Sequence, residues 1–199
     1  GEPMHSGYPL GDAIGGLFGA IGVLAALCQR IKEPDAPGEE IDLSMTEAVL
    51  RLLDFLPIEH DQLGVVRERS GNANQYSAPA AVYSSRDGRY VSLSGSTNAL
   101  FAANARAVDR PDLLEDPRFS TNSSRVQHTV ELNGLFSRWM SEHTLEEILE
   151  AFVREGGTIA PVYSIDQVFS DPQMIAREAI VSVPDADFGA VRVEAIETL

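Results

Sequence analysis

The stretch Gly11-Asp12-Ala13-Ile14-Gly15-Gly16 opens a run of apolar and small residues that continues to Cys28. From Ala13 to Cys28 the run holds 16 residues, with four glycines and no charged side chain. This pattern predicts a helix from about Ala13 to Gln29. Each glycine costs a helix about 1 kcal/mol relative to alanine. Their number therefore indicates that another backbone or a ligand approaches this helix closely.

Asp12 stands immediately before the predicted helix, where a carboxylate has two interpretations. As an N-cap, it accepts hydrogen bonds from the free amides of the first turn. As a nucleophile in a water-poor pocket, it attacks a substrate, while the helix N-terminus keeps it ionised and offers amides to an oxyanion. The local pattern leaves both interpretations open, and the two can coexist.

The composition excludes several classes of function. The 199-residue chain carries a formal net charge of −15. This charge argues against a nucleic-acid partner, because phosphate binding needs a basic face, and against binding to anionic lipid. The apolar run is shorter than the roughly 20 residues that cross a bilayer, so no membrane-spanning segment is expected. The lone cysteine, Cys28, excludes an intramolecular disulfide, fits a reducing compartment and is expected to be buried and inert.

The rest of the chain predicts short helices and strands on either side of a polar linker. The linker, residues 58–78, is rich in glycine and asparagine. Before it we expect a strand at Ile41–Leu43 and a helix from Met45 to about Leu56, capped by Ser44. After it the pattern first predicts a hairpin of strands 81–83 and 90–94 around Asp87-Gly88, then helices 98–108 and 123–140. A helix with a Thr144/Glu147 capping box and a strand at 159–163 follow. The last predicted elements are a Ser164/Gln167 capping box, a short helix after Asp171-Pro172, and strands 180–183 and 191–195.

Other candidate sites carry weaker signals. The four histidines, His5, His60, His128 and His143, have no metal-ligand spacing, so no metal site is expected. Neither a Gly-x-Ser-x-Gly segment nor a phosphate-binding loop is present. The segment Gly71-Asn72-Ala73-Asn74 is either a turn or a loop near a pocket. Side chains such as Phe136, Trp139 and Phe152 are expected in a core.

At this point the sequence resembles a known family. Residues Tyr8–Gly16, then Gly22–Leu27 and Arg30, resemble the nucleophile segment of the family III CoA-transferases, the CaiB–BaiF family. The resemblance covers nearly the whole chain in one order. Further matches are Gly38–Met45, Glu47-Ala48, Gly71-Asn72, Asp87-Gly88 with Tyr90, Arg110–Leu113, Asp116–Phe119, Arg125, Pro161-Val162 and Asp171–Gln173.

The resemblance implies an α/β fold in which a Rossmann-like large domain is joined to a smaller α/β domain. Residues 1–56 are then part of the large CoA-binding domain, 57–80 a linker, 81–165 the small domain and 166–199 a segment that returns toward the large domain. Family members are considerably longer. The chain is therefore interpreted as a piece that lacks the amino-terminal region and the far carboxyl end.

By the same resemblance, Asp12 is the catalytic residue and forms acyl-aspartyl anhydride and aspartyl-CoA intermediates. Gly15 and Gly16 are expected to contact CoA. The implied substrates are an acyl-CoA and a carboxylic acid, with no permanently bound cofactor, in an interlocked cytoplasmic homodimer. Two alternatives stay open: an α-methylacyl-CoA racemase or epimerase of the same family, and a non-catalytic fragment that serves only folding or dimerisation.

Overall fold

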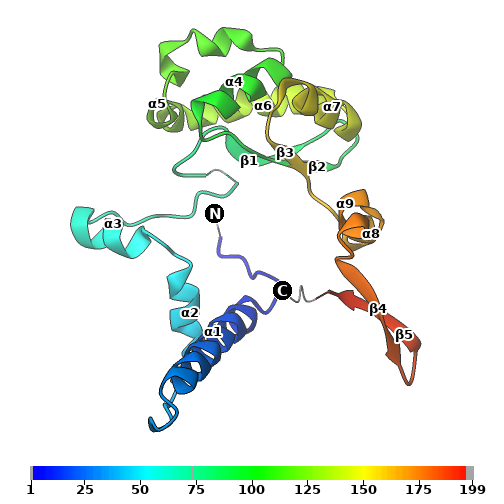
Figure 1. The fold of residues 1–199 in the computed structure, drawn as a ribbon. Coiled ribbons are helices and arrows are strands. Elements are labelled where there is room, and N and C mark those ends of the chain that lie inside the picture. The colour runs from blue at the N-terminus through cyan, green and yellow to red at the C-terminus, as the bar shows by residue number, and fades with distance from the viewer. Residues whose placement is uncertain (1, 73, 196–199) are drawn as a thin grey trace. The chain divides into compact units, whose positions relative to one another are not determined.

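The computed structural model describes residues 2–72 and 74–195 (Figure 1). The chain divides into two compact units, residues 1–71 and residues 72–199. The division lies inside the segment predicted to be a linker.

The first unit contains three helices, α1 (Leu10–Lys32), α2 (Met45–Arg51) and α3 (Leu56–Leu63). The expected helix at Ala13–Gln29 is therefore present and is longer at both ends. The strand expected at Ile41–Leu43 is wrong, because this segment pairs with no strand among the residues that the structure describes.

The segment Ile41–Met45 instead lies along one face of α1, where the glycines make room for it. A Cβ added to Gly15 would stand 3.2 Å from Met45 Cγ, and one added to Gly19 would stand 3.2 Å from Leu43 Cδ2. At Gly22 the added Cβ would meet Ile41 at 3.4 Å. Residues three and four apart share a helix face, so these three glycines form one shallow groove on the surface of α1. Another chain segment therefore approaches this face of the helix closely, mainly through its side chains and not through its backbone or a ligand.

The structure also corrects the prediction of one helix from Met45 to about Leu56. The helix α2 begins as expected, with the Ser44 hydroxyl accepting a hydrogen bond from Glu47 N at 3.4 Å, but it ends at Arg51. A separate helix, α3, follows, with Pro57 in its first turn and Gly64 at φ 66° as its C-cap. Proline suits a first turn because its φ is already helical and the missing N–H has no partner there.

The second unit contains a three-stranded antiparallel sheet in the order β1 (Ala80–Ser84), β2 (Tyr90–Ser94), β3 (Ile159–Pro161). Helices α6 (Thr129–Glu142) and α7 (Leu145–Glu155) contact β1 and β3, and α4 (Asn98–Ala107) packs on α7 (Figure 1). The remaining elements are η1 (Pro111–Leu114), η2 (Pro117–Phe119), α5 (Asn122–Gln127), α8 (Ile165–Ser170), α9 (Pro172–Ala176) and the hairpin β4 (Ile180–Asp185)–β5 (Gly189–Glu194).

The core of this unit lies between the sheet and these helices. Phe136 and Phe152 are completely buried, as predicted, and Trp139 is partly buried against them. The predicted Thr144/Glu147 and Ser164/Gln167 capping boxes are confirmed. The single helix expected at 123–140 is wrong, because it breaks at His128, whose φ and ψ are −111° and 23°.

Arg125 is a fully buried cation at the centre of this unit. Its guanidinium donates from Nε to Ala78 O at 2.8 Å, from Nη1 to Phe119 O at 3.1 Å and Asn98 Oδ1 at 3.0 Å, and from Nη2 to Ser96 O at 3.0 Å. Burial lowers its pKa. Four hydrogen bonds from one side chain thus join segments that are far apart in the sequence.

The turn between β1 and β2 is tied to the start of α7. The carboxylate of Asp87 accepts from Leu145 N at 3.1 Å and from Arg89 Nε at 2.7 Å. Arg89 also pairs with Glu146. Hydrogen bonding, first to the Ser85 hydroxyl and then to Arg89, lowers the pKa of Asp87 to about 2.

Candidate functional site

Asp12 lies in the first turn of α1, and it is not the N-cap that the local pattern suggested. The helix begins at Leu10, three residues before the predicted start at Ala13, and its first helical hydrogen bond runs from Ala13 N to Pro9 O at 3.0 Å. Pro9 therefore occupies the N-cap position, without a capping side chain. The carboxylate of Asp12 is exposed and has no hydrogen bond or ion pair within residues 2–72 and 74–195.

Two backbone amides beside this carboxylate also lack an acceptor. The N–H groups of Gly11 and Asp12 make no hydrogen bond within the described part of the chain. Free amides at a helix N-terminus, together with the helix dipole, favour an anion. Residues His5 to Asp12 line one open hollow of about 560 Å³. An exposed carboxylate, two backbone N–H groups without an acceptor and an open hollow are therefore present in one segment.

The two glycines expected to contact CoA differ in their surroundings. Gly15 is buried, and the side chain of Met45 covers the position where its Cβ would stand. Gly16 is exposed, and an added Cβ would have nothing within 4 Å. Of the two, Gly16 is the one whose open surface could take a ligand, and CoA contact by either stays a prediction.

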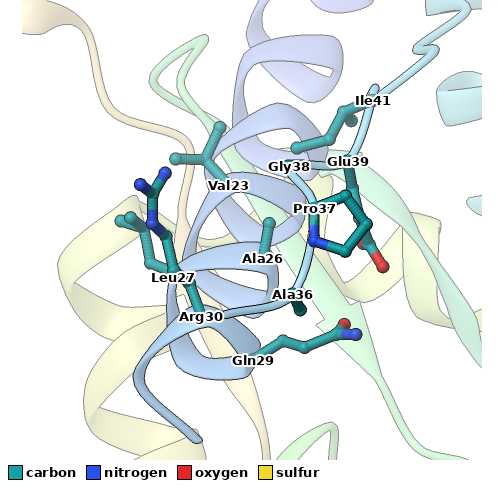
Figure 2. Close-up of a pocket in the computed structure, with 10 residues that line it drawn as sticks. All are labelled: Val23, Ala26, Leu27, Gln29, Arg30, Ala36, Pro37, Gly38, Glu39 and Ile41. Atoms are coloured by element: carbon teal, nitrogen blue, oxygen red, sulfur yellow. The ribbon is translucent and has the colours of Figure 1, made fainter. Parts of the chain in front are cut away.

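A second hollow, of about 180 Å³, lies near the C-terminal end of α1 (Figure 2). Residues of the helix, among them Val23, Leu27 and Arg30, line it together with the returning segment that contains Pro37 and Glu39 (Figure 2). It contains neither Asp12 nor either glycine expected to contact CoA. The ionisable residues that line it are Arg30 and Glu39.

Gly71 and Asn72 lie in a turn, and Ala73 lies outside the described residues. The amide of Asn72 donates to Val82 O at 2.5 Å and accepts from Val82 N at 2.9 Å. The side-chain amide of Asn72 therefore pairs with the outer edge of β1 as a neighbouring strand would. Both its oxygen and its nitrogen are used in these structural hydrogen bonds. Asn72 and Asn74 also border a shallow groove of about 350 Å³ on β1 and β2, so the turn and the loop near a pocket coexist.

The structure corrects two expectations about α1. Cys28 is exposed, not buried, because Ile14 and Gly15 are the buried residues of this helix. The length argument against a membrane span is also wrong. The helix has 23 residues and an 18-residue window of mean hydropathy 1.8, which is long and apolar enough to cross a membrane by length and composition only. Core helices of soluble proteins pass the same test, so this feature is weak support for a span.

Within residues 2–72 and 74–195, no three His, Cys, Asp or Glu side chains are grouped so that they could hold a metal ion. One histidine that the sequence offered without a role, His5, lines the same hollow as Asp12. Spacing alone could not have found it, because its position depends on the turn at Gly7, whose φ is +66°.

The fold is one that solved structures share. It is a mixed α/β fold that matches a crystal structure of a CaiB/BaiF family protein from Brucella suis, with a TM-score of 0.71 and 23% identity over 100% of this chain and 55% of that one. It also matches Rv3272 from Mycobacterium tuberculosis, with a TM-score of 0.80 and 21% identity over 100% of this chain and 51% of that one.

The sequence then identifies the family. The CoA-transferase family III profile matches residues 1–198, and the chain belongs to this family. It is 31% identical to the succinyl-CoA–D-citramalate CoA-transferase of Chloroflexus aurantiacus over 96% of this chain and 47% of that protein. It is 33% identical to the beta subunit of the succinyl-CoA–L-malate CoA-transferase of the same organism, over 95% of this chain and 47% of that subunit. The chain thus spans about half the length of these relatives.

Proposed function

We propose that the protein containing this chain transfers CoA from an acyl-CoA to a carboxylic acid through covalent intermediates on Asp12. Membership of CoA-transferase family III and the named activities of the relatives support the reaction class. The observation that carries the role of Asp12 is its unpaired, exposed carboxylate beside the unoccupied N–H groups of Gly11 and Asp12. A carboxylate can act as a covalent nucleophile when the leaving group and the oxyanion are stabilised.

The reaction then proceeds by exchange of acyl groups at one carboxylate. An oxygen of Asp12 attacks the thioester carbonyl carbon, the C–S bond breaks, and CoA leaves as a thiolate with the electron pair. The thiolate attacks the aspartyl carbonyl of the resulting anhydride and releases the donor acid, which gives an aspartyl-CoA thioester. The acceptor carboxylate repeats these two steps in reverse and restores Asp12. The anhydride and the thioester both keep the acyl group activated, so water must be excluded.

The finer expectations belong to the same proposal. Gly16 leaves room for a substrate next to Asp12, and Gly15 supports the helix by its contact with Met45. We propose an interlocked cytoplasmic homodimer with no permanently bound cofactor. Residues 1–56 would contribute to the large domain and residues 81–165 would form the small one. Because the relatives are about twice as long, the 199-residue chain alone is expected to be inactive.

The test compares the intact protein with its Asp12→Asn variant. We expect the intact protein, given succinyl-CoA as a first donor because relatives carry that name, to exchange CoA with an acceptor acid and to form a hydroxamate at Asp12 when hydroxylamine is added. Asp12→Asn should lose transfer and retain its circular dichroism spectrum. Full activity in this variant would reject the assignment.

The same assay separates the racemase alternative. A racemase exchanges the α-proton of its acyl-CoA with solvent and forms no acyl-enzyme adduct. We therefore expect no deuterium at the α-carbon of an α-methylacyl-CoA in deuterated water. Deuterium incorporation without a hydroxamate would overturn the proposal in favour of the racemase.

A further inference from the structure

His5 is one of the residues that line the hollow next to Asp12. Its Nδ1 accepts a hydrogen bond from Gly7 N at 3.0 Å. A ring nitrogen that accepts a hydrogen bond carries no proton, so the proton of this neutral ring is on Nε2. His5 is exposed, and Nε2–H has no acceptor within the parts of the chain that the structure describes.

The turn that carries His5 is fixed by local bonds. The Ser6 hydroxyl donates to Tyr8 O at 2.7 Å, and Leu10 N donates to the same oxygen. Gly7 has a φ of +66°, a conformation that a residue with a side chain rarely adopts. The imidazole is therefore held at the hollow by the same turn that starts α1.

The charge balance of the proposed reaction indicates what this group could do. The negative charge begins on Asp12, passes to the former carbonyl oxygen of the thioester, and ends on the CoA sulfur. No proton is consumed or released in these steps, so a general acid is unnecessary. A neutral N–H donor near the developing oxyanion lowers the barrier without changing the proton count.

We propose that His5 is a catalytic residue that donates a hydrogen bond from Nε2 to the oxyanion formed when Asp12 attacks the thioester, and this inference rests on the proposed function. The free amides of Gly11 and Asp12, which line the same hollow, would be the other donors to this oxyanion. When the oxyanion collapses, the C–S bond breaks and the proton stays on Nε2 throughout.

Two substitutions of His5 test the roles of its two ring nitrogens separately. The carboxamide of His5→Asn lies at the distance of Nδ1 from the backbone, so it can still accept from Gly7 N and keep the turn, but it has no group at the position of Nε2. His5→Gln places an N–H donor at about the distance of Nε2. The control is His60→Asn, because His60 is an exposed histidine of the same unit whose Nδ1 instead contacts Val65 O at 3.2 Å.

The experiment measures kcat and KM for CoA transfer, and the rate of hydroxamate formation at Asp12, in the intact protein and in each variant. Removing one oxyanion donor lowers kcat by roughly 100- to 1,000-fold in an enclosed site, and we expect about 10- to 100-fold in this open hollow. His5→Asn should lower kcat and the trapping rate together, with KM for acyl-CoA within about twofold of wild type. His5→Gln should recover part of kcat, and His60→Asn should change neither.

The outcomes distinguish this inference from the proposed function. If the unsubstituted protein forms no adduct at Asp12, the proposed function fails before any His5 variant is compared. If the adduct forms and His5→Asn keeps the wild-type kcat and trapping rate, the role of His5 is overturned and that of Asp12 stands. A rise in KM with unchanged kcat would also overturn it, because His5 would then only shape the loop.

Discussion

Replacing Arg125 by methionine tests how residues 72–195 are held together. The substitution keeps an unbranched apolar side chain and removes all four hydrogen bonds of the guanidinium. The acceptors Ala78 O and Phe119 O lie in buried bonds, whereas Ser96 O and Asn98 Oδ1 are partly buried. Water can replace the lost donor only at the partly buried acceptors.

The expected loss in the free energy of unfolding follows from these acceptors. A buried acceptor left without a donor costs about 1–3 kcal/mol, so the two buried carbonyls together cost about 2–6 kcal/mol. The stacking of the guanidinium on Phe101, at 4.5 Å from the ring centroid, is also lost and is worth up to about 2 kcal/mol. Removing a desolvated charge offsets part of both terms. We expect a net loss of about 3 kcal/mol in the free energy of unfolding.

Urea unfolding of the 199-residue chain, followed by the fluorescence of its single tryptophan, Trp139, reports on this unit. The control is Arg138→Met, because Arg138 is exposed on α6 and surface substitutions usually change stability by less than about 0.5 kcal/mol. If Arg125→Met unfolds with the wild-type midpoint and slope, the buried hydrogen bonds do not stabilise this unit and the reasoning is refuted.

Four further variants test separate parts of the account. Gly157→Ala should destabilise the second unit by about 1–3 kcal/mol in the same urea assay, because its Cβ would stand 2.8 Å from the buried ring of Phe152. Gly134→Ala in α6 meets open space and should instead stabilise by about 0.5–1 kcal/mol. The pKa of Asp87 falls from 3.8 to about 2 on folding. The ionised carboxylate therefore adds to the free energy of unfolding in full above pH 3.8, and this contribution is lost as the pH falls through 2. Asp87→Asn should weaken the pH dependence of the urea midpoint in this range. Gly16→Ala should stabilise α1 by about 1 kcal/mol yet lower CoA transfer about tenfold, and unchanged transfer would argue against substrate contact at this glycine.

Much of the second unit could be predicted from the sequence, because its signals are local. The Asp87-Gly88 turn and the Thr144/Glu147 capping box depend on residues within a few positions of one another, and both are present. The helix α3 could not be predicted in this way, since it buries none of its residues and so has no apolar periodicity. The strand expected at Ile41–Leu43 failed because alternating apolar residues say nothing about a pairing partner.

The candidate site was predictable only in part. The position of Asp12 next to a glycine-rich helix is visible in the sequence, and its suggested role came from a resemblance. The N-cap interpretation failed because the chain enters the helix at Leu10, after Pro9, three residues earlier than the apolar run indicates. The place of His5 at the same hollow depends on a positive φ at Gly7, which no spacing rule reports.

The central claim, that Asp12 carries the acyl group, is tested most directly by mass spectrometry of the intact enzyme quenched during turnover with an acyl-CoA. The account predicts that the peptide containing Asp12 gains the mass of an acyl or CoA adduct, which hydroxylamine removes and which Asp12→Asn never acquires. Sustained CoA transfer with that peptide unmodified at every quench time would contradict it.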